Sequence, residues 1–255
     1  MLKTRIIPCL LLKERGLVKT IKFKDPTYVG DPINAVRIFN EKEVDELILL
    51  DITATIENRK PNIELIRDIA GECFMPLAYG GGIRSLEDIR NIFFVGAEKV
   101  VLNSYAVENP AFVREASAVF GSQSIVVSID VKRTLLGKYE VYYASGGRNA
   151  KIDPVKHAVR MAELGAGEIF LNSIDRDGTQ KGYDLELIRR VASAIDVPMV
   201  ACGGAGSLND FVSAVYEGGA SAVAAASMFV FHGKHRAVLI QYPKYSVLEK
   251  LFSEK

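Results

Sequence analysis

The sequence has little net charge, no tryptophan, few cysteines and no long apolar segment. Its 32 lysines and arginines nearly balance 31 aspartates and glutamates, which leaves a formal net charge of +1. A balanced chain has no overall field that would hold nucleic acid or an anionic membrane by counterion release. We therefore expect neither as a partner, and any anion site must be local.

The cysteines and histidines form no metal pattern. Cys9, Cys73 and Cys202 are widely and unequally spaced and adjoin apolar residues, so we expect core thiols in a reducing compartment. The histidines lack metal-ligand spacing, and we expect His157, His232 and His235 to be solvated or capping residues. No cofactor fingerprint is present, so the sequence predicts neither a metal nor a cofactor.

No apolar stretch approaches the ~20 residues that cross a bilayer. The N-terminal run MLKTRIIPCLLLKER is interrupted by Pro8, is flanked by charge and lacks a small-residue cleavage site. It is typical of a first buried strand, and we expect a cytoplasmic protein.

The sequence does contain short apolar runs that alternate with longer amphipathic segments. This pattern is typical of parallel strands buried on both faces, each followed by a helix. Eight such units in 255 residues predict an α/β fold, a closed (β/α)8 or TIM barrel, rather than an open sheet. The expected strands are residues 5–10, 46–51, 76–80, 99–103, 124–130, 168–172, 198–202 and 220–225.

The two halves of the chain are similar at an offset of about 122 residues. DPINAVR recurs as DPVKHAVR, PLAYGGG as PMVACGG, and GAEKVVLNS as GASAVAAAS. We expect one domain, residues 1–255, built from two duplicated half-barrels of about 1–122 and 123–255. Matching loop chemistry is then expected at two opposite points of the rim.

Local signals fix several element boundaries. Asp31 and Asp153 each precede a proline and predict helix N-caps, and Ser85 with Asp88 resembles a cap. Residues 18–22 and 139–143 are too short for helices and predict hairpins in the loops after strands one and five.

Glycine-rich turns follow the third and seventh strands. Gly80 to Gly82 and Gly203 to Gly206 each let backbone amides approach a ligand and open a helix whose N-terminus favours an anion. The next strand ends in Asn103-Ser104 in one half and Ala226-Ser227 in the other. These loops predict a ligand phosphorylated at both ends, and the alternative is that the glycines only form tight turns.

Several strands end in an acid, where a barrel places catalytic groups. We expect Asp51 and Asp175 to brace loops, whereas Asp130 ends a fully apolar run, where burial can raise its pKa toward use as a general acid. Aligning CLLLK with SIDVK places Leu11 where the first half should supply a second carboxylate. Paired acid–base chemistry across the site is then excluded.

Charges also stand where four apolar runs begin, at Arg5, Glu46, Lys99 and Glu168. They alternate in sign and are able to form a ring that closes the barrel floor. From spacing alone, ordinary solvated strand ends are the favoured alternative.

Over essentially its whole length the chain resembles the cyclase subunit of imidazole glycerol phosphate synthase. The resemblance rests on RIIPCL, LDITAT, YGGGIRS, EKVVLNS, AVENP, FGSQSIVVSIDVK, SIDRDGT, KGYD and CGGAGS. It implies a barrel that receives ammonia from a separate glutaminase subunit docked on its floor, as a heterodimer. The ammonia then cleaves and cyclises a bisphosphorylated ribulosyl aminoimidazole substrate.

The resemblance also implies roles for individual residues. It makes the four floor charges a salt-bridged ammonia gate, Asp130 a catalytic aspartate, and Glu98 and Gln123 contacts of the glutaminase. The implied ligand and phosphate contacts are Lys19 on a mobile loop, Gly82, Asn103 and Ser104 at one end, and Asp177, Gly178, Gly204, Ala226 and Ser227 at the other.

The chain departs from the family pattern at several positions. The second catalytic aspartate falls on Leu11, and Asn172 and Cys202 replace small hydroxyl residues. The tail FVFHGKHRAVLIQYPKYSVLEKL resembles a paralogous branch from bacterial surface-polysaccharide clusters. In that branch the barrel and glutaminase supply ammonia to a third protein, a sugar amidotransferase that makes an acetamidino sugar.

Three hypotheses follow. The first is a cyclase-like barrel that conducts ammonia for acetamidino sugar synthesis. The second is a genuine cyclase subunit of histidine biosynthesis that tolerates Leu11. The third is a non-catalytic docking scaffold.

Overall fold

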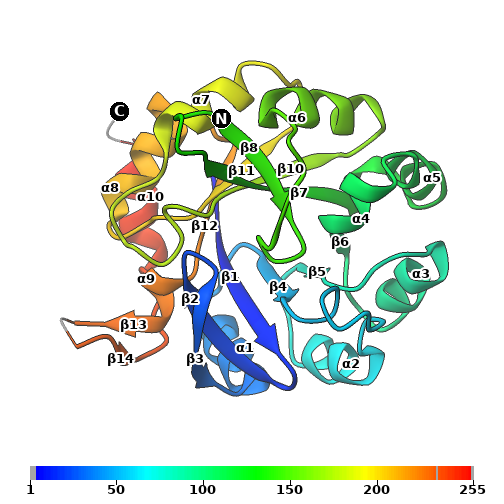
Figure 1. Cartoon of the computed structure of the whole chain (residues 1–255). Helices are drawn as coiled ribbons and strands as arrows, with labels where there is room; N and C mark the ends of the chain where they lie inside the picture. Colours follow the sequence, from blue (N-terminus) through cyan, green and yellow to red (C-terminus); the bar gives the residue numbers. More distant parts are fainter. Residues whose placement is uncertain (1–3, 234, 254–255) are drawn as a thin grey trace.

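The computed structural model describes residues 4–233 and 235–253, and over this range it forms a closed barrel of eight parallel strands surrounded by helices (Figure 1). Each barrel strand pairs with its neighbours, and β12 pairs with β1 while β10 pairs with β7, which closes the ring. The fold prediction is confirmed. The barrel strands are β1 (Arg5–Lys13), β4 (Leu47–Asp51), β5 (Leu77–Gly80), β6 (Lys99–Leu102), β7 (Ile125–Arg133), β10 (Glu168–Ser173), β11 (Met199–Cys202) and β12 (Ala222–Ala225).

Helices follow the strands around the outside of the ring. They are α1 (Pro32–Glu41), α2 (Ile63–Gly71), α3 (Leu86–Phe94), α4 (Ser104–Glu108), α5 (Ala111–Phe120), α6 (Pro154–Glu163), α7 (Leu185–Ala192), α8 (Leu208–Val212) continued by a π turn (Ser213–Glu217), α9 (Ser227–Val230) and α10 (Tyr245–Ser253). Among the described residues no helix is both long enough and apolar enough to cross a membrane.

The predicted helix caps form. Asp31 accepts a hydrogen bond from Asn34 N, and Asp153 accepts from Val155 N and Lys156 N. Ser85 and Asp88 make a reciprocal capping box, and Ser207 and Asp210 repeat it in the second half. The same start signals thus recur in both halves.

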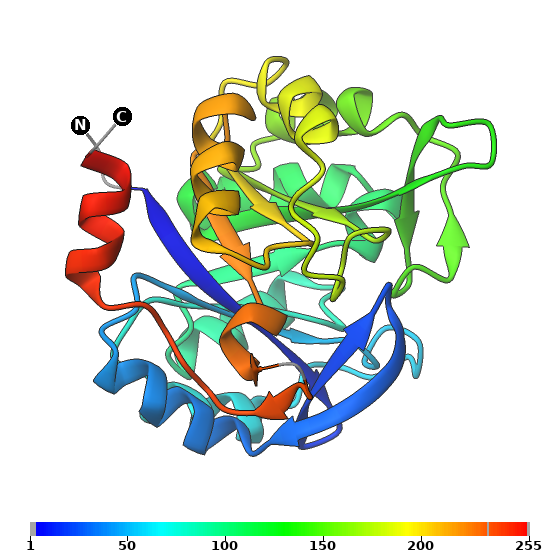
Figure 2. The same ribbon diagram turned by 90° about the vertical axis from the view of Figure 1, so that its left-hand side faces the viewer.

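Three hairpins extend from the mouth end of the barrel. β2 (Gly16–Ile21) and β3 (Lys24–Gly30) follow β1, and β8 (Tyr139–Tyr143) with β9 (Arg148–Asn149) follows β7, as predicted. β13 (Phe231–His232) and β14 (Ala237–Val238) form the third, near the C-terminus. Figure 2 shows the first two projecting on the same side of the molecule.

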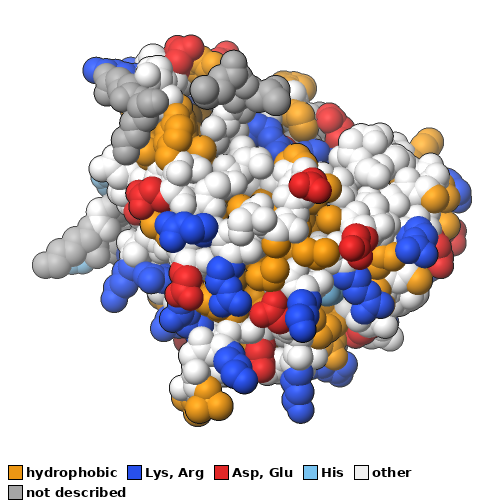
Figure 3. All heavy atoms as spheres, turned by 90° about the horizontal axis from the view of Figure 1, so that it is seen from above, with side chains coloured by type: hydrophobic (Ala, Val, Ile, Leu, Met, Phe, Trp, Pro, Cys, Tyr) orange, Lys and Arg blue, Asp and Glu red, His pale blue; other side chains and the backbone are white. Residues whose placement is uncertain are grey.

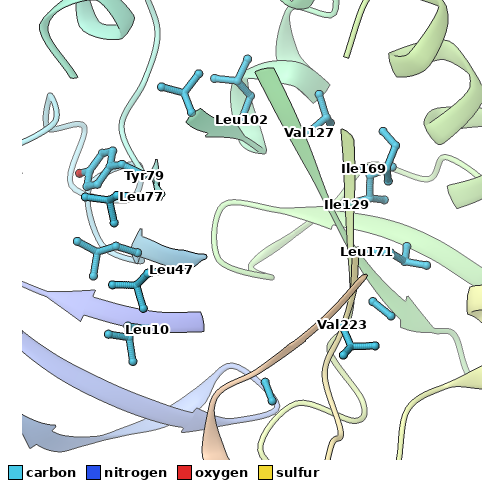
Figure 4. Packing of buried hydrophobic residues seen from close by; sticks show 14 of the residues in the cluster. Leu10, Leu47, Leu77, Tyr79, Leu102, Val127, Ile129, Ile169, Leu171 and Val223 are labelled. Carbon is cyan, nitrogen blue, oxygen red and sulfur yellow. The ribbon is translucent and has the colours of Figure 1, made fainter. Parts of the chain in front are cut away.

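Two hydrophobic cores follow from the period-2 alternation of each strand. Outward-facing residues such as Leu10, Leu47, Val127 and Leu171 pack between barrel and helices (Figure 4). Residues facing the barrel axis form a second cluster, which includes Phe170. The outer core anchors the helices, and the inner core fills the barrel beneath the mouth.

One histidine prediction is wrong. His157 is only 3% exposed rather than solvated, because it shares the buried face of the amphipathic helix α6 with Ala158 and Met161. Cys9 and Cys202 are buried free thiols, whereas Cys73 lies in the turn after α2 and is half-buried.

Candidate active site

The floor of the barrel is closed by four charged side chains that bind one another. Arg5 donates hydrogen bonds to both Glu46 and Glu168. The Nζ atom of Lys99 lies 2.9 Å from Glu46 Oε1 and 3.2 Å from Glu168 Oε2. Both carboxylates are nearly buried, so each is neutralised by two cations where it would otherwise be costly to desolvate. Solvated strand ends, the interpretation favoured by spacing alone, do not describe this ring.

The axis-facing positions connect this ring with the mouth. On β10, Glu168, Phe170 and Asn172 lie on one side of the strand, because alternate residues share a face. Phe170 belongs to the inner apolar core, and Asn172 lines a cavity in the mouth. The barrel interior therefore changes from charged to apolar to polar along its axis.

Three aspartates line the mouth cavity, and Asp130 is the one without a cationic partner among the described residues. Asp130 accepts hydrogen bonds from Asn103 Nδ2 at 3.2 Å and, weakly, from Asn172 Nδ2 at 3.5 Å. Burial raises the pKa of Asp130 to about 7, and the charge on Asp177 adds to the rise while the two amide bonds oppose it. Asp130 is poised to gain or lose a proton near neutral pH.

The other two carboxylates in the cavity wall are engaged. Asp51 accepts from the backbone of Thr53 and Ala54 and pairs with Arg59 at 3.3 Å. It braces its loop, as predicted, and Asp175 likewise accepts from Arg133 N at 2.8 Å. Asp177 forms a buried ion pair with Lys19.

Leu11 lines the same cavity as Asp130. It lies on β1, and β1 and β7 stand four strands apart in either direction around the closed sheet. The side chain that faces Asp130 across the mouth is thus apolar, and it packs against the inner core together with Leu50.

The first glycine loop and its partners border the cavity. Gly81 and Gly82 have positive φ, and a Cβ at Gly82 would come within 2.4 Å of Arg59 O, so only glycine fits there. Asn103 and Ser104 line the cavity beside it. The Ser104 hydroxyl accepts a hydrogen bond from Ala144 N at 3.0 Å.

The residues expected to bind the second phosphate lie mostly outside the cavity wall. Among the described residues, Ala226 lines the cavity, whereas Gly178, Gly204 and Ser227 do not. Gly204 has φ +116° and no room for a Cβ, which would come within 2.2 Å of Gly182 O. The buried Ser227 Oγ has no hydrogen-bond partner among the described residues.

The β2–β3 hairpin covers this end of the mouth. Lys19 Nζ lies 2.8 Å from Asp177 Oδ1, and Thr20 Oγ1 donates to Asp177 Oδ2 at 3.0 Å. Lys19, expected on a mobile loop beside the ligand, is therefore buried against a carboxylate in this structure. The β8–β9 turn meets the hairpin where Phe23 packs on Gly146, a contact that no local sequence signal revealed.

The outer floor carries the two residues expected to face a glutaminase. Glu98 and Gln123 are exposed in the segments that precede β6 and β7. Phe74, in the loop before β5, and Phe94, the last residue of α3, were missed by sequence analysis and are 86% and 85% exposed. The Phe74 ring in a loop was a detectable signal, because such rings are usually buried.

One face of the molecule shows the mixture of charges that the balanced composition leads one to expect. On the face seen in Figure 3, acidic and basic side chains are interspersed.

Fold and site together define a (β/α)8 barrel with a salt-bridged floor and, at its mouth, the carboxyl group of Asp130, which has no cationic partner among the described residues. The model of the histidine biosynthesis protein family matches residues 5–236. The chain belongs to this family, and within it to the HisF-like subunits of imidazole glycerol phosphate synthase.

Three relatives illustrate the relationship. A protein of Pseudomonas aeruginosa provisionally named imidazole glycerol phosphate synthase subunit hisF2 is 57% identical over 98% of this chain and 99% of its own length. One of Vibrio vulnificus provisionally named subunit hisF3 is 47% identical over 98% and 96%. An Alkaliphilus metalliredigens protein named imidazole glycerol phosphate synthase subunit HisF is 45% identical over 91% and 92%.

Proposed function

We propose that this barrel receives ammonia from a glutaminase on its floor and delivers it at the mouth for acetamidino sugar synthesis in surface polysaccharide, rather than for histidine synthesis. In this proposal a third protein, a sugar amidotransferase, uses the ammonia to convert its sugar substrate into the acetamidino sugar. The bisphosphorylated ligand that binds at the mouth is either a substrate or an effector whose binding signals that the mouth is occupied.

The observation that carries the proposal is that Leu11 faces Asp130. A cyclisation that needs two proton-transferring groups lacks one here, because a leucine neither binds nor releases a proton. Loss of such a group typically costs 10²- to 10⁴-fold in rate. Asp51 and Asp177 are poor substitutes, since both are held in ion pairs.

The retained floor and interior support ammonia transfer. Ammonia is neutral and small, so an apolar barrel interior between the charged ring and the mouth passes it while excluding ions. The ring opens if Lys99 swings outward, because its side chain is 21% exposed whereas both glutamates are nearly buried.

The floor surface supports docking of a partner. Phe74 and Phe94 offer exposed aromatic rings, and Glu98 is exposed in the segment between Phe94 and β6. Protein interfaces use such a combination of apolar anchors and polar rim. The numbered names of the relatives from Pseudomonas aeruginosa and Vibrio vulnificus fit a paralogous branch.

The test is turnover of the bisphosphorylated cyclase substrate by the purified barrel with excess ammonium salt, which bypasses the glutaminase. We expect no appreciable turnover by the wild type and measurable cyclisation by Leu11→Asp. Leu11→Asn is the matched control, since it has the size and polarity of aspartate but cannot transfer the proton. Appreciable wild-type turnover would refute the proposal.

A genuine cyclase of histidine synthesis is the second candidate. It is favoured by the raised pKa of Asp130, because a single carboxyl group that titrates near pH 7 is able to act as acid and base in turn. This candidate predicts that Leu11→Asp changes turnover little. The docking-scaffold alternative instead predicts that calorimetry detects no binding of the bisphosphorylated ligand.

A further inference from the structure

The C-terminal hairpin places an arginine against the loop after β10. Arg236 sits in the turn between β13 and β14, and its Nη1 donates a hydrogen bond to Gly178 O at 3.2 Å. Its guanidinium carbon lies 4.5 Å from the ring centroid of Phe231, which holds the group flat against the hairpin. Arg236 lies in the C-terminal tail and is the last residue that the family model matches.

Arg236 has unused hydrogen-bonding capacity. No carboxylate of the described residues pairs with it, and its single described hydrogen bond occupies one of the five N–H groups of a guanidinium. An arginine that is half-buried, stacked and oriented, yet has no counter-ion, is prepared for an external anion.

The neighbouring glycine and serine residues carry no charge of their own. Gly178 and Gly204 have positive φ, and the space of each missing Cβ is taken by Thr20 O and Gly182 O, respectively. Ser227 Oγ is buried without a partner among the described residues. Lys19 lies close by but is already neutralised by Asp177. A phosphate monoester carries almost two negative charges near neutral pH, and backbone dipoles alone compensate them incompletely.

Gly178 links the arginine with this site. Its position is fixed from two sides, because a Cβ there would come within 2.3 Å of Thr20 O and its carbonyl accepts from Arg236. The β2–β3 hairpin and the C-terminal hairpin therefore meet on the same glycine of the loop after β10.

We propose that Arg236 is the anion-binding side chain of the second phosphate site, which it completes from the tail hairpin. The ligand group is a phosphate monoester of a sugar or polyol, bound by the guanidinium, by Ser227 and by the backbone at Gly178 and Gly204. The inference rests on the proposed function only in that the mouth takes a ligand phosphorylated at both ends.

Calorimetric titration of the full chain with inorganic phosphate at low salt tests this assignment. We expect Arg236→Gln to weaken one phosphate site at least tenfold, Arg236→Lys to retain part of the affinity through its charge, and Arg148→Gln to change nothing. Arg148 is the matched control because it is an exposed arginine of the β8–β9 hairpin. Thermal unfolding of each variant separates binding from folding.

Unchanged phosphate affinity in Arg236→Gln, or no phosphate binding by the wild type, would overturn the inference. So would a loss that Arg236→Lys fails to restore and that accompanies a lowered Tm, because this pattern belongs to an arginine that only braces Gly178. These outcomes are independent of the turnover test with Leu11→Asp, so failure of the ammonia-transfer proposal and failure of this assignment are distinguishable.

Discussion

Lys19 on β2 and Asp177 after β10 are far apart in the sequence but form a buried ion pair, with Nζ 2.8 Å from Oδ1. Their side chains are 4% and 9% exposed. The pair fastens the first hairpin over the loop after β10, so access to the phosphate site that we propose there requires the pair to separate or the hairpin to move with it.

Removing one partner should release the hairpin. Lys19→Met leaves Asp177 buried without its cation, a change that typically costs roughly 3–5 kcal/mol when the site cannot open. We expect residues 16–30 to separate from the loop instead, with amide hydrogen exchange there at least ~10-fold faster. Arg37→Met is the control, because it removes an exposed pair with Glu72. Equal exchange in both variants would show that the pair does not hold the hairpin.

Asp130 should titrate near neutrality. Its folded pKa, about 7, lies above the ordinary value because burial penalises the charged form. Its contribution to stability is therefore fully present below about pH 4 and is lost as the pH rises through 7. Carbon-13 NMR of the aspartate carboxyls should show one resonance with a midpoint near pH 7 that is missing in Asp130→Asn. A carboxyl that titrates near pH 4 would contradict the burial argument.

The contribution of His157 to folding stability should change with pH in the direction opposite to that of Asp130. Burial lowers its pKa to about 4, so the folded state keeps the ring neutral while the unfolded chain binds a proton below about pH 6.5. The contribution is present above pH 6.5 and decreases as the pH falls toward 4, by up to about 3 kcal/mol. His157→Leu should lose this part of the pH dependence of urea unfolding, and the exposed His232→Gln should keep it. An unchanged acid limb in His157→Leu would rule the histidine out.

Opening the floor should uncouple glutamine hydrolysis in the partner from product formation. Lys99→Ala removes one of the two cations of the ring, and the ratio of product formed to glutamine hydrolysed in the reconstituted complex should change at least twofold. Lys42→Ala is the control, since Lys42 is exposed on the floor side at the end of α1 but lies outside the ring. Unchanged coupling in Lys99→Ala would argue against passage through the floor.

The exposed aromatics of the floor should anchor the glutaminase. Phe74→Asp replaces an apolar ring with a charge, and we expect at least ~10-fold weaker association by calorimetry, as for an interface hot spot. Leu135→Asp is the control, because Leu135 is fully exposed in the β7–β8 turn at the mouth. Equal affinities would place the docking surface elsewhere.

The strands, caps and hairpins could be predicted because their signals are local. Apolar runs buried on both faces fixed the eight strands to within a few residues, and Asp31 and Asp153 fixed helix starts through contacts within three residues. The burial of His157 was not predicted because its signal is not local. Its burial depends on which face of α6 meets the barrel, and a polar residue on that face carries no local sign of it.

The sequence by itself determined the barrel, the family and the presence of Leu11 where an acid was expected, since each of these lies in short motifs and their order. Only the tertiary structure decided which charges meet. It joined Arg5, Glu46, Lys99 and Glu168 into one ring and paired Lys19 with Asp177. Among the residues that the structure describes, it left Asp130 without a cation and Arg236 without an anion. The physical reason is that electrostatic partnership depends on distances of a few ångströms between segments remote in sequence, which closure of the barrel creates.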